Sequence, residues 1–241
     1  PQQASHAKRR LDLPIEPPPK RQKAFSFPVD SVNDFKELRN NNYFYVDKTK
    51  YIKDIEQDRQ VLMFLRPMRL GKSLFLSTLK YFYDVNEAAS FDSLFGDLEI
   101  FQHASDLLHN QYLILYWNFS RVDCTCVEAM KQSLNDHVND SVKNFCEAYA
   151  PILGINEEDA VSIINANNCL SSLEGIFRRV RSTNYKIYLL LDEYDYITNE
   201  FLDPTDAQSY GLVRQKQGLL KAILGVVKDS CSKEIARVFI T

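Results

Sequence analysis

A glycine, a lysine and a serine stand together at positions 71 to 73, within the stretch RPMRLGKS that covers residues 66–73. The glycine lets the backbone turn tightly and approach an anion. A helix that starts there points free N–H groups and its positive dipole end at a phosphate. The lysine can reach the β- and γ-phosphates of a nucleotide, and the serine hydroxyl can bind Mg²⁺. Gly71, Lys72 and Ser73 therefore predict a site for a nucleotide phosphate with magnesium.

The start of this stretch departs from the usual phosphate loop, which has a glycine where Arg66 stands. A side chain there would clash if the backbone required a positive φ angle. Alternatively, Arg66 and Arg69 could lie along the phosphates and add positive charge. Pro67 fixes one φ angle of the loop. We expect the whole loop to contact the nucleotide, which gives the cofactor-binding residues Arg66, Pro67, Met68, Arg69, Leu70, Gly71, Lys72, Ser73 and Leu74.

Two acidic residues, Asp192 and Glu193, follow directly after an apolar stretch at residues 187–191. Such charges are costly beside apolar residues unless they serve a cation. Asp192 fits the carboxylate that a phosphate-loop enzyme places at the tip of a neighbouring strand to hold Mg²⁺. Glu193 fits a general base that polarises the attacking water. The alternative is that both carboxylates are simply solvated at a strand end.

The last apolar stretch ends at Thr241, which we expect to contact the γ-phosphate or the attacking water. These considerations give Glu193, Lys72 and Thr241 as the expected catalytic residues. Ser73 and Asp192 are the expected metal ligands.

A phosphate loop requires a strand before it and a helix after it, and the sequence contains patterns for both. VLMFL at 61–65 has the length of a strand, and residues 72–84 place apolar side chains on one helical face. Further apolar stretches of strand length lie at 112–120, 186–195 and 235–241, and helical patterns lie at 125–149, 156–168, 170–182 and 206–229. This alternation predicts an α/β fold with a mainly parallel sheet that helices cover on both faces. Because no fifth strand is visible, we expect the domain to be incomplete after Thr241.

Ahead of the loop, the sequence predicts a short helix over residues 31–41 with Ser31 as its N-cap. A β-prone stretch follows at 43–47, and apolar residues at helical spacing indicate another helix over 48–57.

Residues 1–27 differ from the rest because they are rich in proline, glutamine and basic residues. We expect a disordered tail there and a globular domain over 28–241. Two basic clusters within residues 8–23 have the form of a bipartite signal for a nuclear-import receptor. The alternative is a solvated basic tail without a receptor, in which case we expect a cytoplasmic protein.

Composition narrows the functional classes further. The chain of 241 residues is 45% apolar and carries a net charge of −3, which argues against non-specific nucleic-acid binding by the body of the protein. The five cysteines form no C-x-x-C pair, which fits a reduced intracellular setting. The apolar stretches are far shorter than the ~20 residues of a membrane-spanning helix.

Several stretches together resemble the AAA-ATPase-like proteins that occur in bacteria and some fungi. They are YVDKTKYI at 45–52, LRPMRLGKSLFLSTL at 65–79, FDSLFGDLEIF at 91–101, LLLDEYDYI at 189–197 and FIT at 239–241. The arginine–proline start of the loop is characteristic of that family, so the resemblance makes Arg66 a family trait. Met68 and Leu70 depart from the family's usual residues.

The resemblance implies a P-loop NTPase of the ASCE/AAA-like type, with three α/β/α layers and with ATP and Mg²⁺ as cofactors. It places Lys48 and Thr49 near the nucleotide, although a helix start with Asp or Thr as the cap explains these residues equally well. It also makes Asp195 a candidate for a supporting hydrogen bond or a substrate contact. Family members often carry a nuclease-like domain, of which this sequence shows nothing. A homo-oligomer and DNA are further partners that the resemblance leaves open.

We expect ATP binding and Mg²⁺-dependent hydrolysis, and a slow turnover because no arginine finger is evident. The alternative is a nucleotide-gated nuclear interaction module with little or no hydrolysis, associated with nucleic acid. In a third hypothesis the nucleotide site is vestigial.

Overall fold

The structure is a computed structural model that describes residues 26–28, 32–58, 60–65, 67, 70–199 and 207–241, without the side chains of 198 and 207–217. Most of the expected tail, including the basic clusters at 8–23, lies outside the described residues, as do Ser31, Arg66, Met68 and Arg69. None of the helices in the described parts is both long enough and apolar enough to cross a membrane.

The centre of the molecule is a four-stranded sheet in which every pair of neighbours is parallel. Its strands are β1 (Val61–Met63), β2 (Tyr112–Asn118), β3 (Lys186–Asp192) and β4 (Ala236–Ile240), in the spatial order β1-β4-β3-β2. The predicted α/β class with a parallel sheet is therefore confirmed. The carboxylate strand β3 is not beside β1, however, because β4 lies between them.

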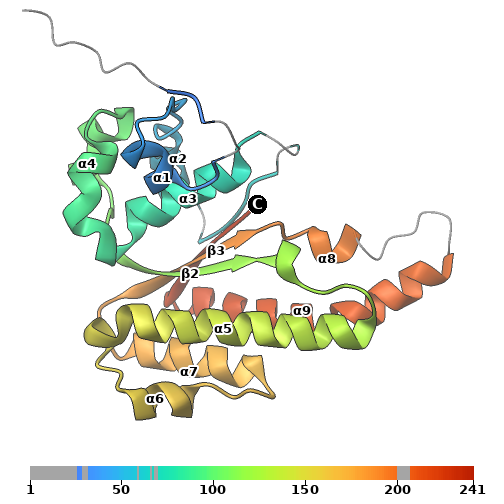
Figure 1. The fold of residues 1–241 in the computed structure, drawn as a ribbon. Helices are drawn as coiled ribbons and strands as arrows, with labels where there is room; N and C mark the ends of the chain where they lie inside the picture. The colour runs from blue at the N-terminus through green and yellow to red at the C-terminus, as the bar shows by residue number, and fades with distance from the viewer. Residues whose placement is uncertain (1–25, 29–31, 59, 66, 68–69, 200–206) are drawn as a thin grey trace, which may run out of the picture.

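Helices cover both faces of the sheet (Figure 1). One layer consists of α5 (Val127–Leu153), α7 (Cys169–Arg181) and α9 (Ala207–Ser232), with α6 (Glu157–Ile163) packed against α5 and α7. The other consists of α1 (Phe35–Asn40), α2 (Tyr51–Gln57), α3 (Lys72–Tyr83), α4 (Phe91–Phe95) and the 3-10 segments η1 (Val85–Ser90) and η2 (Glu99–Asp106). The short segments η3 (Phe119–Arg121) and α8 (Tyr196–Asn199) follow β2 and β3.

Alternating side chains of the strands fix these layers, since successive residues of a strand face opposite sides of the sheet. On β3, Leu189 and Leu191 belong to the core that includes α5, α7 and α9, whereas Leu190 belongs to the core around α3. A strand that is apolar on both faces is typical of a parallel sheet between two helical layers.

The helix α3 packs so that its first turn lies beside the carboxyl ends of the strands. Leu76, Leu79 and Phe82 are fully buried against the sheet residues of the same core. Each such side chain contributes about 1.5–3 kcal/mol when removed from water. This burial holds the helix, and with it the Gly71 turn, in a fixed place.

Two expectations for the N-terminal part are wrong. The helix α1 begins at Phe35, because the Asp34 carboxylate accepts a hydrogen bond from the Glu37 N–H at 2.8 Å and so acts as the N-cap that was expected at Ser31. The stretch 43–47 forms no strand beyond an isolated bridge between Ser26 and Tyr43.

The expected strand at 61–65 is shorter and more exposed than predicted. β1 ends at Met63, and Val61 and Met63 are half exposed, because among the described strands β1 lies at the sheet edge and pairs with β4 alone. Pairing nevertheless continues, since the Phe64 N–H donates to the Ile240 carbonyl at 2.8 Å.

Candidate functional site

The turn before α3 has the backbone that the glycine was expected to provide. Gly71 adopts a left-handed conformation with φ 74° and is the N-cap of α3, a conformation that a side chain would strain. The N–H groups of Lys72, Ser73 and Leu74 belong to the first turn, where an α-helix offers no internal acceptor. The start of α3 therefore presents donors to an anion.

Lys48 lies directly over this turn. Its Nζ donates to the Leu70 carbonyl at 3.4 Å, and a Cβ atom added to Gly71 would lie 3.6 Å from the same nitrogen. The cationic head of Lys48 thus adds positive charge at the place where the helix dipole is also positive.

Asp192 lies at the end of β3 and is held by several donors. The Thr241 hydroxyl donates to its Oδ1 at 2.6 Å and the Glu193 N–H donates to the same oxygen at 3.1 Å. The hydroxyl of Tyr116, which is two residues before the end of β2, lies 3.5 Å from Oδ2. Asp192 is only 1% exposed and Thr241 only 5%, so solvent does little to weaken the bond between these two residues. Tyr116 is 40% exposed.

Tyr116 acts as a donor over the whole physiological range. Burial and the negative charge of Asp192 raise the pKa of Tyr116 to about 12, so its hydroxyl keeps its proton. The parallel register of β2 and β3 pairs Asn118 with Asp192, which brings Tyr116 to the same edge of the sheet.

The chain turns sharply after β3. Glu193 has φ 54°, which is unusual for a residue with a side chain and costs roughly 1–2 kcal/mol. After this turn the Tyr194 N–H donates to the Thr241 carbonyl at 3.1 Å, so the chain returns to the end of β4. Left-handed residues of this kind cluster at functional sites.

A cavity of about 300 Å³ lies between the loop, the end of β4 and the apolar residues Met63, Phe64 and Leu65 at the end of β1. Lys72 and Pro67 line it from the loop, Thr241 from β4, and Tyr194 and Asp195 from the turn after β3. The structure thus brings Lys72 and Thr241 to one cavity, and Asp192 lies immediately behind Thr241. Glu193 and Ser73 are partly exposed nearby but do not line this cavity.

Asp195 and Tyr194 line the cavity although the sequence gave neither of them a catalytic role. Asp195 lines the cavity, and its carboxylate also accepts a hydrogen bond from the Asn199 side chain at 2.9 Å within α8. No sequence pattern predicts the place of Tyr194 in the cavity, because the left-handed turn at Glu193 is what directs it back to β4.

A second cavity, of about 470 Å³, lies on the other side of Gly71. Its apolar part includes Leu62, Phe64 and Phe75, and α2 forms one wall with Tyr51 and Ile55 among other residues. The remaining lining residues are Val46, Asp47, Lys48, Lys50, Asp54, Asp58, Leu70 and Gly71. A neighbouring cavity of about 350 Å³ extends past Leu74. An apolar cavity with a few polar groups at its rim is typical of a site for a small organic ligand.

Thr49 is fully buried and uses its hydroxyl inside the protein. It donates to the Asp47 carboxylate at 2.7 Å and accepts from the Ile100 N–H at 3.3 Å. Asp47 in turn accepts from the backbone N–H groups of Thr49 and Glu99, both at 2.8 Å. Neither Thr49 nor Asp47 caps α2, whose N-cap Lys50 has no side-chain cap bond. The bonds occupy the Thr49 hydroxyl inside the protein, so we leave Thr49 out of the proposed ligand contacts.

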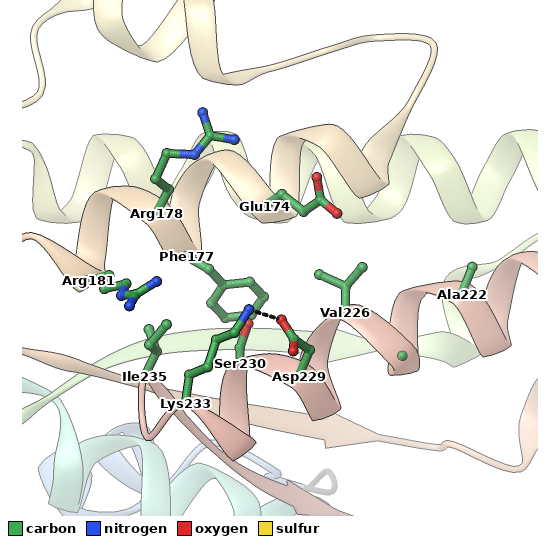
Figure 2. Close-up of a pocket in the computed structure, with 11 residues that line it drawn as sticks. Glu174, Phe177, Arg178, Arg181, Ala222, Val226, Asp229, Ser230, Lys233 and Ile235 are labelled. Carbon is green, nitrogen blue, oxygen red and sulfur yellow. Dashed lines mark hydrogen bonds and ion pairs between the residues drawn. The ribbon is translucent and has the colours of Figure 1, made fainter.

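A further cleft, of about 550 Å³, lies in the opposite helical layer between α7 and the last turns of α9 (Figure 2). Its charges have both signs, since Arg178 and Arg181 stand beside Glu174 and Lys233 pairs with Asp229 at 2.5 Å. The cleft is formed by the later turns of both helices and contains no helix start. The first turn of α3 does offer free N–H groups to a phosphate, so the loop before α3 suits a triphosphate better.

Comparison with protein families gives one match. The model for AAA-ATPase-like proteins, described as predicted AAA-ATPase, matches residues 30–241. Comparisons with curated proteins and with solved structures gave no significant match. The matched range includes the loop, Lys48 and the ends of β3 and β4.

Proposed function

Because the chain belongs to the predicted AAA-ATPase family, we propose that it binds ATP with Mg²⁺ at the loop before α3 and hydrolyses the bond between the β- and γ-phosphates. The observation that carries the proposal is the hydrogen bond between Thr241 and Asp192 behind the cavity that Lys72 lines. Lys72, Thr241 and Asp192 thereby place a cation, a hydroxyl and a carboxylate at the edge of the sheet where α3 begins. Phosphoryl transfer requires these groups.

The phosphates would lie at the start of α3. The N–H groups of its first turn and the Lys72 ammonium would bind the β- and γ-phosphates. Pro67, Leu70 and Leu74 would shape the loop around them. Arg66 and Arg69 remain proposals from the sequence, as additional cations along the phosphates, with Met68 between them.

The side chains at this edge fit a magnesium ion. The Asp192 carboxylate and the Ser73 hydroxyl supply oxygen ligands, which Mg²⁺ prefers. Among the described residues, the Asp192 Oδ2 takes part in one long hydrogen bond, from Tyr116 at 3.5 Å. No group of three or more His, Cys, Asp or Glu in the described part of the chain is placed to hold a metal, so the other ligands would be phosphate and water. When bound, Mg²⁺ would neutralise charge on the phosphates.

The base and ribose would occupy the cavity of about 470 Å³ beside Gly71. Phe64 and Phe75 offer an apolar surface for the base, and Lys48 stands between this cavity and the loop. The preference for ATP over other nucleotides rests on the family.

We assign the activation of water to Glu193, with Asp195 as the alternative because it lines the smaller cavity. The single hydroxyl proton of Thr241 is used in its hydrogen bond to Asp192. In this arrangement Thr241 can only accept a hydrogen bond from the attacking water. Its first task is then to hold the Asp192 carboxylate in place.

Phosphate release and ATP binding, measured on the parent chain and on Glu193→Gln, test the proposal. We expect the parent to release phosphate slowly and Glu193→Gln to bind ATP without release. If Asp195→Asn loses phosphate release and Glu193→Gln keeps it, the residue that activates the water is Asp195 and not Glu193. Binding without any release by the parent would favour the nucleotide-gated interaction module, and no binding at millimolar ATP would overturn both functions.

The partners suggested by the basic clusters at 8–23 remain predictions. Nuclear import predicts that a fluorescent fusion of the chain enters the nucleus and that replacing both clusters prevents entry. DNA binding by the folded part requires a salt-dependent complex that survives deletion of residues 1–27.

A further inference from the structure

Arg237 is a half-buried cation on β4 that lines neither of the cavities assigned to ATP. Its guanidinium donates to the carbonyls of Ile55 and Glu56, the latter at 3.4 Å. Its Cζ lies 5.7 Å from the centre of the buried Tyr188 ring. Arg237 therefore connects the sheet to the last turn of α2.

The helix α2 depends on such contacts. It has seven residues, no side-chain cap at its first turn, and Ile52 and Ile55 as its buried residues. A helix this short does not hold its shape alone in water. An arginine at its final carbonyls supplies further donors there, although the Ile55 carbonyl also accepts from the Asp58 N–H at 3.3 Å. Its charge also complements the negative end of the helix dipole.

The same helix is a wall of the larger cavity, to which it contributes Tyr51, Asp54 and Ile55. Ile55 both lines this cavity and gives its carbonyl to Arg237. We propose that Arg237 is a positioning residue that fixes α2 as the wall of the base and ribose cavity. This inference rests on the proposed function, because it assigns that cavity to the nucleoside part of ATP.

The fold offers a matched control for this role. Arg179 on α7 donates to the carbonyl of Leu153 at 2.9 Å and to that of Gly154, at the end of α5. It is also half buried and also holds the last carbonyls of a helix. It belongs to the layer on the opposite face of the sheet, so its loss perturbs stability without touching α2.

The test compares ATP with inorganic tripolyphosphate, which has the phosphates but neither base nor ribose. Titration calorimetry with Mg²⁺ measures both ligands on the parent, Arg237→Gln and Arg179→Gln. We expect about ten-fold weaker ATP binding in Arg237→Gln, since hydrogen bonds to a charged group are lost, and unchanged tripolyphosphate binding. In turnover assays KM for ATP should rise with kcat retained, and Arg179→Gln should match the parent for both ligands.

Three results would overturn the inference: ATP binding by Arg237→Gln as tight as in the parent, an equal loss of both ligands, or the same losses in Arg179→Gln. If circular dichroism shows that Arg237→Gln does not fold, Arg237→Lys takes its place in the comparison. Lysine keeps the charge of arginine but not its planar guanidinium. Binding of ATP should therefore again be weaker, and binding of tripolyphosphate unchanged. A parent chain that binds neither ligand would instead refute the proposed function, and this inference with it.

Discussion

Replacing Thr241 with valine removes the hydroxyl that holds Asp192 and leaves the shape of the side chain almost unchanged. Thr241 and Asp192 are 5% and 1% exposed, so water cannot replace the lost donor. A hydrogen bond to a charged group contributes about 1.5–3 kcal/mol. The Glu193 N–H and the Tyr116 hydroxyl still contact the carboxylate, so we expect Thr241→Val to lower the free energy of unfolding by about 2 kcal/mol at pH 7.

Urea denaturation followed by circular dichroism measures this change, with Thr241→Ser as the control that keeps the hydroxyl. In an Asp192→Asn background the acceptor is neutral, so the same replacement should cost only about 1 kcal/mol. The reasoning is refuted if Thr241→Val unfolds at the parent's urea concentration, or if Thr241→Ser loses as much stability as Thr241→Val.

Three further replacements test other parts of the account. Gly71→Ala should lose about 1–2 kcal/mol of stability, because φ is 74° there, and should also weaken ATP binding in calorimetry. Lys48→Met should weaken ATP binding several-fold with little change in urea stability, because the Lys48 contact to Leu70 is exposed. His137→Gln should make the free energy of unfolding fall less steeply in acid. The Asn118 N–H donates to the His137 ring at 3.4 Å, and a glutamine can accept this bond without titrating.

The sign of the acid effect follows from the environment of His137. Burial, helped by the charge of Arg121, lowers the pKa of His137 below its ordinary value of 6.5, against a smaller opposite effect of Asp140. The folded state therefore binds the proton less tightly than the unfolded chain, and the free energy of unfolding falls as pH decreases below 6.5. Equal slopes for the parent and His137→Gln between pH 5 and 7 would contradict this assignment.

For the other two replacements, the contradicting results concern binding. Gly71→Ala with the parent's stability would show that the left-handed turn is not strained by a side chain. Lys48→Met with unchanged ATP affinity would remove Lys48 from the site, and Lys50→Met is its control on the rim of the same cavity.

Much of the sheet was predictable because its strands are apolar on both faces. The stretches around β2, β3 and β4 have strand length and end in polar residues, and the turn at Gly71 sits between a strand and a helix as the loop chemistry requires. The grouping of Lys72 with Thr241 follows from that pattern once parallel strands are assumed, since their carboxyl ends share one edge.

What the sequence did not reveal depends on contacts between distant segments. Tyr116 approaches Asp192 only through the register of β2 against β3, and no local pattern encodes that register. Asp34 is the N-cap of α1 in place of the expected Ser31. Its carboxylate is held there because it also accepts a hydrogen bond from Tyr81 on α3, at 2.8 Å. The burial of Thr49 likewise depends on Asp47 and on the distant Ile100.

The most direct test of the central claim is the thermal stability of the parent chain and of Lys72→Ala with and without Mg·ATP. A ligand that binds the folded state raises its stability, by about 2.7 kcal/mol at a concentration of about 100 times Kd. We predict a concentration-dependent rise in Tm for the parent and little or none for Lys72→Ala. No rise in the parent at millimolar Mg·ATP, or the same rise in Lys72→Ala, would contradict a nucleotide site at the start of α3.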